Sequence, residues 1–164
     1  MIAKKEKPPH DFWREYEEKI GEKVLVRSLG QYISGWEEFG NAEKNPIWGL
    51  VIATSGGFRF HHFPQVNWLS ALTSFGLGNE PPKEKTIFIS GDAILSAVLY
   101  RETKWYKKIF SSSPPRLVIH YRNEAGTEKE LLLIIEHQPD GLAEALCTPP
   151  SDKTIPHQNT AGHS

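Results

Sequence analysis

Residues 48–63, with the sequence WGLVIATSGGFRFHHF, give the clearest indication of the fold class of this chain. Two runs rich in β-branched and aromatic residues flank Ser55-Gly56-Gly57, and paired glycines supply the positive φ angles of a tight hairpin turn. Side chains alternate along a strand, so Phe58, Phe60 and His62 share one face. We therefore predict an antiparallel hairpin here, with these three side chains on the core face.

Further strand signals lie on both sides of this hairpin. Residues 24–26, 32–33 and 86–89 have strand-like composition, and residues 117–122 and 129–136 flank a glycine-containing turn that predicts a second, longer hairpin. The apolar residues of 93–100 fit both helical and strand periods, and the shortness of the segment together with Val98 favours a strand. The order of elements shows no alternation of strands and helices, which indicates an antiparallel sheet around one core.

Two helices are expected at the ends of the domain. Asp11 can cap the first, in which Tyr16 and Ile20 fall four residues apart, and Gly21 is a natural stop. This helix either packs on the domain or serves as an arm that binds a partner. The second helix is expected to begin at Pro139-Asp140, with Asp140 as its cap.

Length and composition indicate one soluble domain in the cytoplasm. The 164 residues carry a formal net charge of −1, so the chain as a whole attracts neither nucleic acid nor an anionic membrane. The one cysteine, Cys147, cannot form an internal disulfide, and no apolar run is long enough for a signal peptide or a membrane span. We expect a flexible N-terminus over 1–9, a single domain over 10–147 and a disordered tail over 148–164.

The order of elements resembles the pleckstrin-homology-like superfold, including its GRAM-type and bacterial variants. The hairpin 49–63, the segment IFISGDAILSAV at 87–98 and the closing hairpin 117–136 followed by 139–147 carry this resemblance. It implies a mainly β (α+β) fold, either an antiparallel barrel or a strongly curved sheet, with an N-terminal helix and a short C-terminal helix. The last helix lacks the tryptophan found in many family members, and the connection 64–85 is long for such a domain.

Members of that superfold that bind phosphoinositides use basic residues on the first strands and the loop between them. The matching positions in this chain are Lys23 and Arg27, with Lys44 further along. The same loop region also contains Glu37, Glu38 and Glu43, and their negative charge opposes a phosphate-bearing ligand. The sequence therefore argues against a lipid head-group site at this position.

A basic and aromatic segment, residues 101–110, is the most distinctive candidate for a binding surface. Basic and aromatic side chains alternate there in a way that suits an anionic lipid surface or an acidic partner. The alternative is that its aromatic residues pack on the sheet while its lysines keep the loop soluble. The candidate binding residues are Arg101, Lys104, Trp105, Tyr106, Lys107 and Lys108.

The residues that usually carry catalysis or metal binding form no recognisable set. His61 and His62 are adjacent in a predicted strand and point to opposite faces, so they do not share an ion. His120 and His137 lie on the two strands of the predicted closing hairpin without an acidic or cysteine ligand at a known spacing. Cys147 lies at the end of a predicted helix, far along the chain from any His–acid pair that could activate its thiol. We expect no catalytic residue, metal or cofactor.

The sequence therefore predicts a non-catalytic binding or scaffolding module whose partner is another protein. Binding to an anionic membrane through 101–110 is the first alternative. A small enzyme or ligand carrier with a pocket near 64–85 is the second. We expect no nucleic-acid partner, and the oligomeric state is open.

Overall fold

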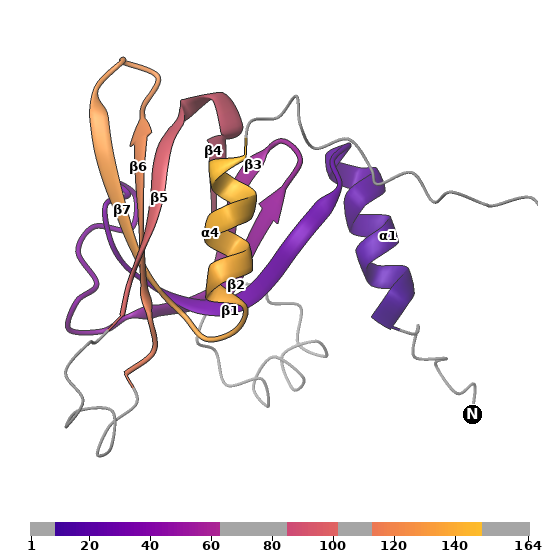
Figure 1. Ribbon diagram of the computed structural model, residues 1–164, viewed down its shortest axis with the longest axis horizontal. Coiled ribbons are helices and arrows are strands. Elements are labelled where there is room, and N and C mark those ends of the chain that lie inside the picture. Colours follow the sequence, from indigo (N-terminus) through magenta and orange to yellow (C-terminus); the bar gives the residue numbers. More distant parts are fainter. Residues whose placement is uncertain (1–8, 63–84, 102–112, 149–164) are drawn as a thin grey trace, which may run out of the picture.

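The computed structural model describes residues 9–62, 85–101 and 113–148, which form an antiparallel sheet and two α-helices (Figure 1). No α-helix within this part of the chain is long and apolar enough to span a membrane. In chain order the elements are α1 (Pro9–Ile20), β1 (Val24–Ser34), β2 (Ile47–Thr54), β3 (Gly57–His62), β4 (Thr86–Ser90), the 3₁₀ helix η1 (Gly91–Ala93), β5 (Ile94–Tyr100), β6 (Arg116–Arg122), β7 (Glu128–Ile135) and α4 (Pro139–Cys147).

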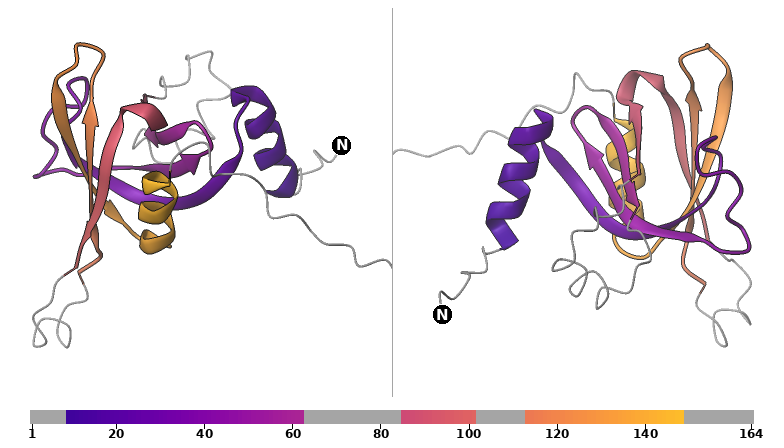
Figure 2. Two further views of the ribbon diagram at one scale, coloured as in Figure 1. Left: turned by 45° about the horizontal axis from the view of Figure 1, so that its top comes forward. Right: turned by 180° about the vertical axis from the view of Figure 1, so that it is seen from behind.

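Strand β1 joins the two halves of the seven-stranded sheet, whose order is β4-β3-β2-β1-β7-β6-β5. Residues 24–32 of β1 pair with β2, and residues 30–34 pair with β7, so one 11-residue strand belongs to both halves. Figures 1 and 2 show β1 running along both halves of the curved sheet. The position of every other strand depends on this shared strand.

The sheet is strongly curved and open. Strands β4 and β5 lie at its opposite edges, yet the three residues of η1 connect them. A connection this short requires the sheet to coil until its two edges approach each other at η1. The edges do not pair, so of the two expected architectures the curved sheet is correct and the closed barrel is not.

The predicted tight hairpin at 48–63 is confirmed. Thr54 faces Gly57 across the turn, and its hydroxyl accepts the N–H groups of Gly56 and Gly57 at 3.3 and 3.2 Å. Phe58 and Phe60 are fully buried, as the alternation of side chains predicts. The closing hairpin and the strand at 94–100 are confirmed as well.

The core fills the concave side of the sheet. Buried side chains from both halves meet there, and α4 adds two more from its inward face, Leu142 and Leu146. The largest fully buried side chains are Tyr32, Phe58, Phe60, Ile52, Ile87, Leu117, Ile119, Leu131, Leu133, Ile135, Leu142 and Val51. Because α4 packs chiefly on β5, β1 and β2, it connects the two halves of the sheet on this side.

Helix α1 packs on the domain, which is the first of the two roles expected for it. The Tyr16 hydroxyl and the imidazole Nε2 of His61 on β3 lie at hydrogen-bond distance, 2.5 Å, and Arg27 of β1 stacks on the Trp13 ring at 4.4 Å. The helix begins at Pro9, so the prediction that Asp11 caps it is wrong. Gly21 ends it, as predicted, with a φ of +70°.

Helix α4 also begins before its expected cap. Gln138, in the left-handed region, occupies the N-cap position, and Asp140 lies in the first turn without a capping hydrogen bond. The Asp140 carboxylate instead forms an ion pair with Arg101, at the end of β5. An aspartate in the first helical turn is favoured by the positive end of the helix dipole. Aspartate is also favoured at the N-cap, which explains why the sequence predicted the cap at Asp140, two residues after its actual position.

Glu22 ties the end of α1 to the β2–β3 hairpin. Its carboxylate receives two hydrogen bonds from Arg59, at 2.8 and 3.2 Å, and one from the Thr54 hydroxyl. Burial alone would raise the pKa of Glu22, but the Arg59 and Thr54 hydrogen bonds outweigh it and lower that pKa below its ordinary value. The carboxylate is therefore ionised in the folded protein at neutral pH.

Glu22→Gln is expected to destabilise the protein by about 1–3 kcal/mol, because Arg59 then loses its charged partner in a half-buried site. A folded-state pKa below the unfolded value stabilises the wild type above the usual glutamate titration range, and this contribution disappears as the pH falls through that range. Urea unfolding at neutral and acidic pH should show the difference between the two proteins narrowing in acid.

Glu18→Gln is the matched control for this prediction. Glu18 lies on α1, four residues before Glu22, in an exposed pair with Arg14 at 4.0 Å, and an exposed pair contributes at most a few tenths of a kcal/mol. An equal loss in both variants would show that the half-buried position of Glu22 has no special role.

Candidate functional site

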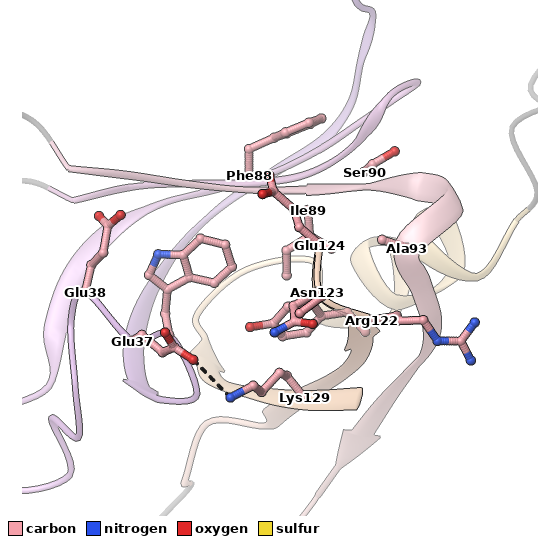
Figure 3. Close-up of a pocket in the computed structure, with 13 residues that line it drawn as sticks. Glu37, Glu38, Phe88, Ile89, Ser90, Ala93, Arg122, Asn123, Glu124 and Lys129 are labelled. Atoms are coloured by element: carbon pink, nitrogen blue, oxygen red, sulfur yellow. Dashed lines mark hydrogen bonds and ion pairs between the residues drawn. The ribbon is translucent and has the colours of Figure 1, made fainter. Parts of the chain in front are cut away.

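A groove of about 500 Å³ lies between strand β4 and the turn that joins β6 to β7 (Figure 3). Three separate parts of the chain line it: the start of the β1–β2 loop, the β4–η1 segment and the β6–β7 hairpin. The lining residues are Trp36, Glu37, Glu38, Phe88, Ile89, Ser90, Ala93, Tyr121, Arg122, Asn123, Glu124, Ala125 and Lys129. We refer to this site as the Trp36 groove.

Tyr32 holds the turn that carries Trp36. From its buried position on β1, the Tyr32 hydroxyl lies 2.6 Å from the Gly40 carbonyl and 3.1 Å from the Trp36 carbonyl, and it accepts the Trp36 N–H at 2.9 Å. Phe39 packs on the ring of Tyr32, with ring centroids 5.2 Å apart, and on that of Phe60. One phenol therefore fixes both ends of the turn from 36 to 40, and the core fixes its middle.

The floor of the groove is aromatic and aliphatic. The rings of Trp36 and Tyr121 are tilted by 30° with centroids 6.0 Å apart, and Ile89 and Ala93 contribute from the opposite side. The Tyr121 hydroxyl donates to the Gly35 carbonyl at 3.1 Å. Burial, reinforced by the negative charge of Glu37, raises the pKa of Tyr121, so this phenol remains a neutral donor at physiological pH.

The rim of the groove is acidic. Lys129 pairs with Glu37 at 3.0 Å, as the dashed line in Figure 3 shows. Arg122 pairs with Glu128 at 3.4 Å, so both basic residues of the lining already have an acidic partner. Glu38 and Glu124 are exposed and have no ion pair with any residue that the structure describes. The groove therefore offers two negative charges above an apolar floor, a combination that suits a ligand with apolar and cationic groups.

The basic and aromatic segment predicted as a binding surface is described only at its first residue. Arg101 is exposed and pairs with Asp140. Lys104, Trp105, Tyr106, Lys107 and Lys108 lie outside the described residues, as do most of the predicted pocket region near 64–85 and both predicted flexible ends apart from Pro9 and Thr148. Those predictions stay untested.

The basic residues that match phosphoinositide-binding positions do not gather into one site. Lys23 pairs with Glu17, and Arg27 stacks on Trp13. Lys44 lies in the loop between β1 and β2, away from both. These positions therefore form no shared cationic cluster.

The described histidines are separated as well. His61 and His62 point to opposite faces of β3, and His120 faces Glu130, five residues before the end of β7, whereas His137 follows that strand. Five residues of strand span roughly 17 Å, which keeps these two imidazoles apart. Among the described residues, no group of three His, Cys, Asp or Glu side chains is placed to hold a metal ion.

Sequence reasoning missed the Trp36 groove as a site. It singled out Glu37 and Glu38 only as evidence against a phosphate site. The structure makes Trp36 partly buried in the groove wall. Its connection to Tyr121, 85 residues away along the chain, leaves no local signal in the sequence.

Comparisons with known proteins do not assign this chain to a family. A scan against protein-family models and a search of curated proteins return no match. The chain is similar to the C-terminal domain of an unknown protein from Leishmania infantum, with a TM-score of 0.46, 12% identity, and 87% of this chain and 96% of that one covered. It is also similar to the hSac2 domain from the human phosphoinositide phosphatase Sac2, with a TM-score of 0.39, 7% identity, and 86% and 77% covered. Both similarities are weak; they are consistent with a sheet-rich fold and carry no statement about function.

Proposed function

We propose that this protein is a non-catalytic binding module of the pleckstrin-homology-like type, and that it binds a segment of another protein in the Trp36 groove. The observation that carries the proposal is the groove itself, with its aromatic floor, its acidic rim and its size of about 500 Å³. A concave apolar site with a few placed charges is a common form of recognition site.

The order of strands supports the pleckstrin-homology-like assignment. A long first strand lies in the middle of the sheet, shared by both halves, and a helix follows the last strand. The open corner between β4 and β5 is bridged by three residues instead of a ladder of hydrogen bonds. Fold alone does not define a function, so the functional proposal depends on the groove.

The charge of the groove favours a protein segment over a phosphate-bearing ligand. Glu38 and Glu124 would repel a lipid head group, while Arg122 and Lys129 already have acidic partners. Binding to an anionic membrane through 101–110, and an enzyme or ligand carrier with a pocket near 64–85, stay predictions from the sequence.

Trp36→Ala is expected to abolish binding of the partner, because the substitution removes a large aromatic part of the groove floor. The photoreactive residue benzoylphenylalanine, placed at the exposed rim position Ala125, should give a discrete cross-linked product in a lysate of the source organism. We expect the yield of this product to fall at least about tenfold in the Trp36→Ala background, as for loss of a binding hot spot.

Trp48→Ala is the matched control, since Trp48 is an exposed tryptophan on β2 that does not line the groove. The cross-linked product should persist in this variant. An equal yield with Trp36→Ala, from a protein whose thermal unfolding shows it to be folded, would contradict the proposal.

A further inference from the structure

Within the described residues, the backbone of β4 has hydrogen-bonding groups without a partner at the edge of the sheet. At the two ends of the β3–β4 ladder, His62 N–H donates to the Lys85 carbonyl at 2.9 Å and Gly91 N–H donates to the Gly56 carbonyl at 2.8 Å. Hydrogen-bonded pairs recur at every second residue of an antiparallel ladder. Ile87 and Ile89 therefore bond to β3, opposite Phe60 and Phe58.

The alternate residues of β4 turn their backbone groups outward. By the same alternation, the N–H and C=O of Thr86 and Phe88 and the N–H of Ser90 point away from β3. Since β4 is the last strand of the sheet on this side, no described strand meets these groups. An edge of this kind is a template for one more strand.

This edge borders the Trp36 groove directly. Phe88, Ile89 and Ser90 of β4 are lining residues, and Figure 3 shows Ile89 pointing to one side of the strand while Phe88 and Ser90 point to the other. A strand added beside β4 would alternate in the same way, so every second side chain would enter the groove over Trp36 and Tyr121.

The opposite edge of the sheet is less open. Helix α4 packs along β5, and the Cys147 thiol donates to the Ala97 carbonyl at 3.4 Å. At the other end of the helix, Asp140 pairs with Arg101 beside the last residue of β5. The helix therefore contacts β5 from its middle, at Ala97, to its end, and the site for an added strand is at β4.

We propose that the partner segment binds in an extended conformation as an eighth strand beside β4, with apolar side chains in the Trp36 groove and lysine or arginine beside Glu38 and Glu124. This inference rests on the proposed function and adds the conformation and the charge of the ligand. Backbone hydrogen bonds to an edge strand provide affinity, and pockets for alternate side chains provide specificity. The negative charges of Glu38 and Glu124 select a basic segment against an acidic one.

Amide hydrogen exchange of the full-length chain, followed by NMR, tests the geometry. In the free protein the amides of Thr86, Phe88 and Ser90 should exchange faster than those of Ile87 and Ile89. The probe is a blocked seven-residue peptide with valine at position 3, phenylalanine at position 5, lysine at both ends and serine or threonine elsewhere. On saturation with this peptide, exchange of the Phe88 amide should slow at least about tenfold, because a hydrogen-bonded amide exchanges only on opening.

N-methylated peptides test the hydrogen bonds from the ligand side. Only every second amide of an added strand faces β4, so methylation at one set of alternate positions should weaken binding about tenfold per site, and methylation at the other set should have little effect. Equal effects at both sets, or binding without slower exchange at Phe88, would overturn strand addition while leaving the groove as a binding site.

Charge variants test the class of ligand. The double variant Glu38→Lys, Glu124→Lys should weaken binding of the lysine peptide about tenfold, whereas Glu43→Lys, an exposed site in the same loop outside the groove lining, should not. A version of the peptide with glutamate at both ends should fail to bind. Equal binding of both peptides would overturn the basic ligand. Failure of both to bind, while the cross-link at Ala125 remains dependent on Trp36, would overturn this inference and leave the proposed function standing.

Discussion

Gly35→Ala is expected to destabilise the protein by more than about 3 kcal/mol, the largest effect of any single methyl group we consider. Gly35 has a φ of +105° and lies so close to β7 that a Cβ atom there would overlap the Glu130 carbonyl. Both causes act together, because the backbone conformation disfavours a side chain and the neighbouring atoms are main chain that cannot rotate away. Urea unfolding followed by circular dichroism measures the loss.

Gly40→Ala separates the two causes. Gly40 belongs to the same loop and has a φ of +64°, but a Cβ atom there would meet nothing within 4 Å. The cost should therefore be the left-handed backbone alone, about 1–2 kcal/mol. A loss at Gly35 no larger than that at Gly40 would show that the loop moves away from β7 without penalty.

Tyr32→Phe is expected to destabilise the protein by about 2 kcal/mol and to reduce binding in the Trp36 groove. The substitution keeps the ring in the core but leaves the Gly40 carbonyl and the Trp36 N–H without their shared partner. Unsatisfied polar groups in a buried site cost about 1–3 kcal/mol. The phenol is available as a donor over a wide pH range, since burial raises its pKa although the hydrogen bond at Trp36 opposes this.

Tyr100→Phe is the matched control for Tyr32→Phe, because Tyr100 is 56% exposed on β5 and its hydroxyl has no hydrogen bond within the described part of the chain. Its free energy of unfolding should change by less than about 0.5 kcal/mol. Binding of the lysine peptide, measured by calorimetry, separates positioning from stability. Unchanged affinity in folded Tyr32→Phe would contradict a role for this phenol in holding Trp36.

Both variants act on the groove through the backbone that carries Trp36. Gly35 allows β1 to turn sharply beside β7, and Tyr32, three residues earlier, fastens the turn that follows. Neither Gly35 nor Tyr32 lines the groove, so both are positioning residues. Because the backbone that carries Trp36 is already fixed, a ligand that binds to Trp36 causes little further loss of conformational entropy.

Local patterns in the sequence were enough to predict the strands, the two hairpins and the approximate extent of both helices. These features depend on local signals: alternation in 48–63, paired glycines at its turn, and Gly21 after the first helix. The errors at Asp11 and Asp140 were also local, because an aspartate near a helix start suits both the cap and the first turn. The order of elements was enough to predict a mainly β domain with a curved sheet.

The open form of the sheet and the position of the Trp36 groove depend on tertiary contacts that no local pattern in the sequence predicts. The pairing of β1 with both β2 and β7 brings Trp36, Ile89 and Tyr121 together from positions more than 80 residues apart at the extremes. The edge position of β4 in the described sheet likewise leaves no signal in the sequence, because a strand with the sequence TIFIS could lie in the middle of a sheet or at its edge. The residue types of a strand reflect its own burial and backbone conformation. Which strand lies beside it depends on contacts between distant parts of the chain.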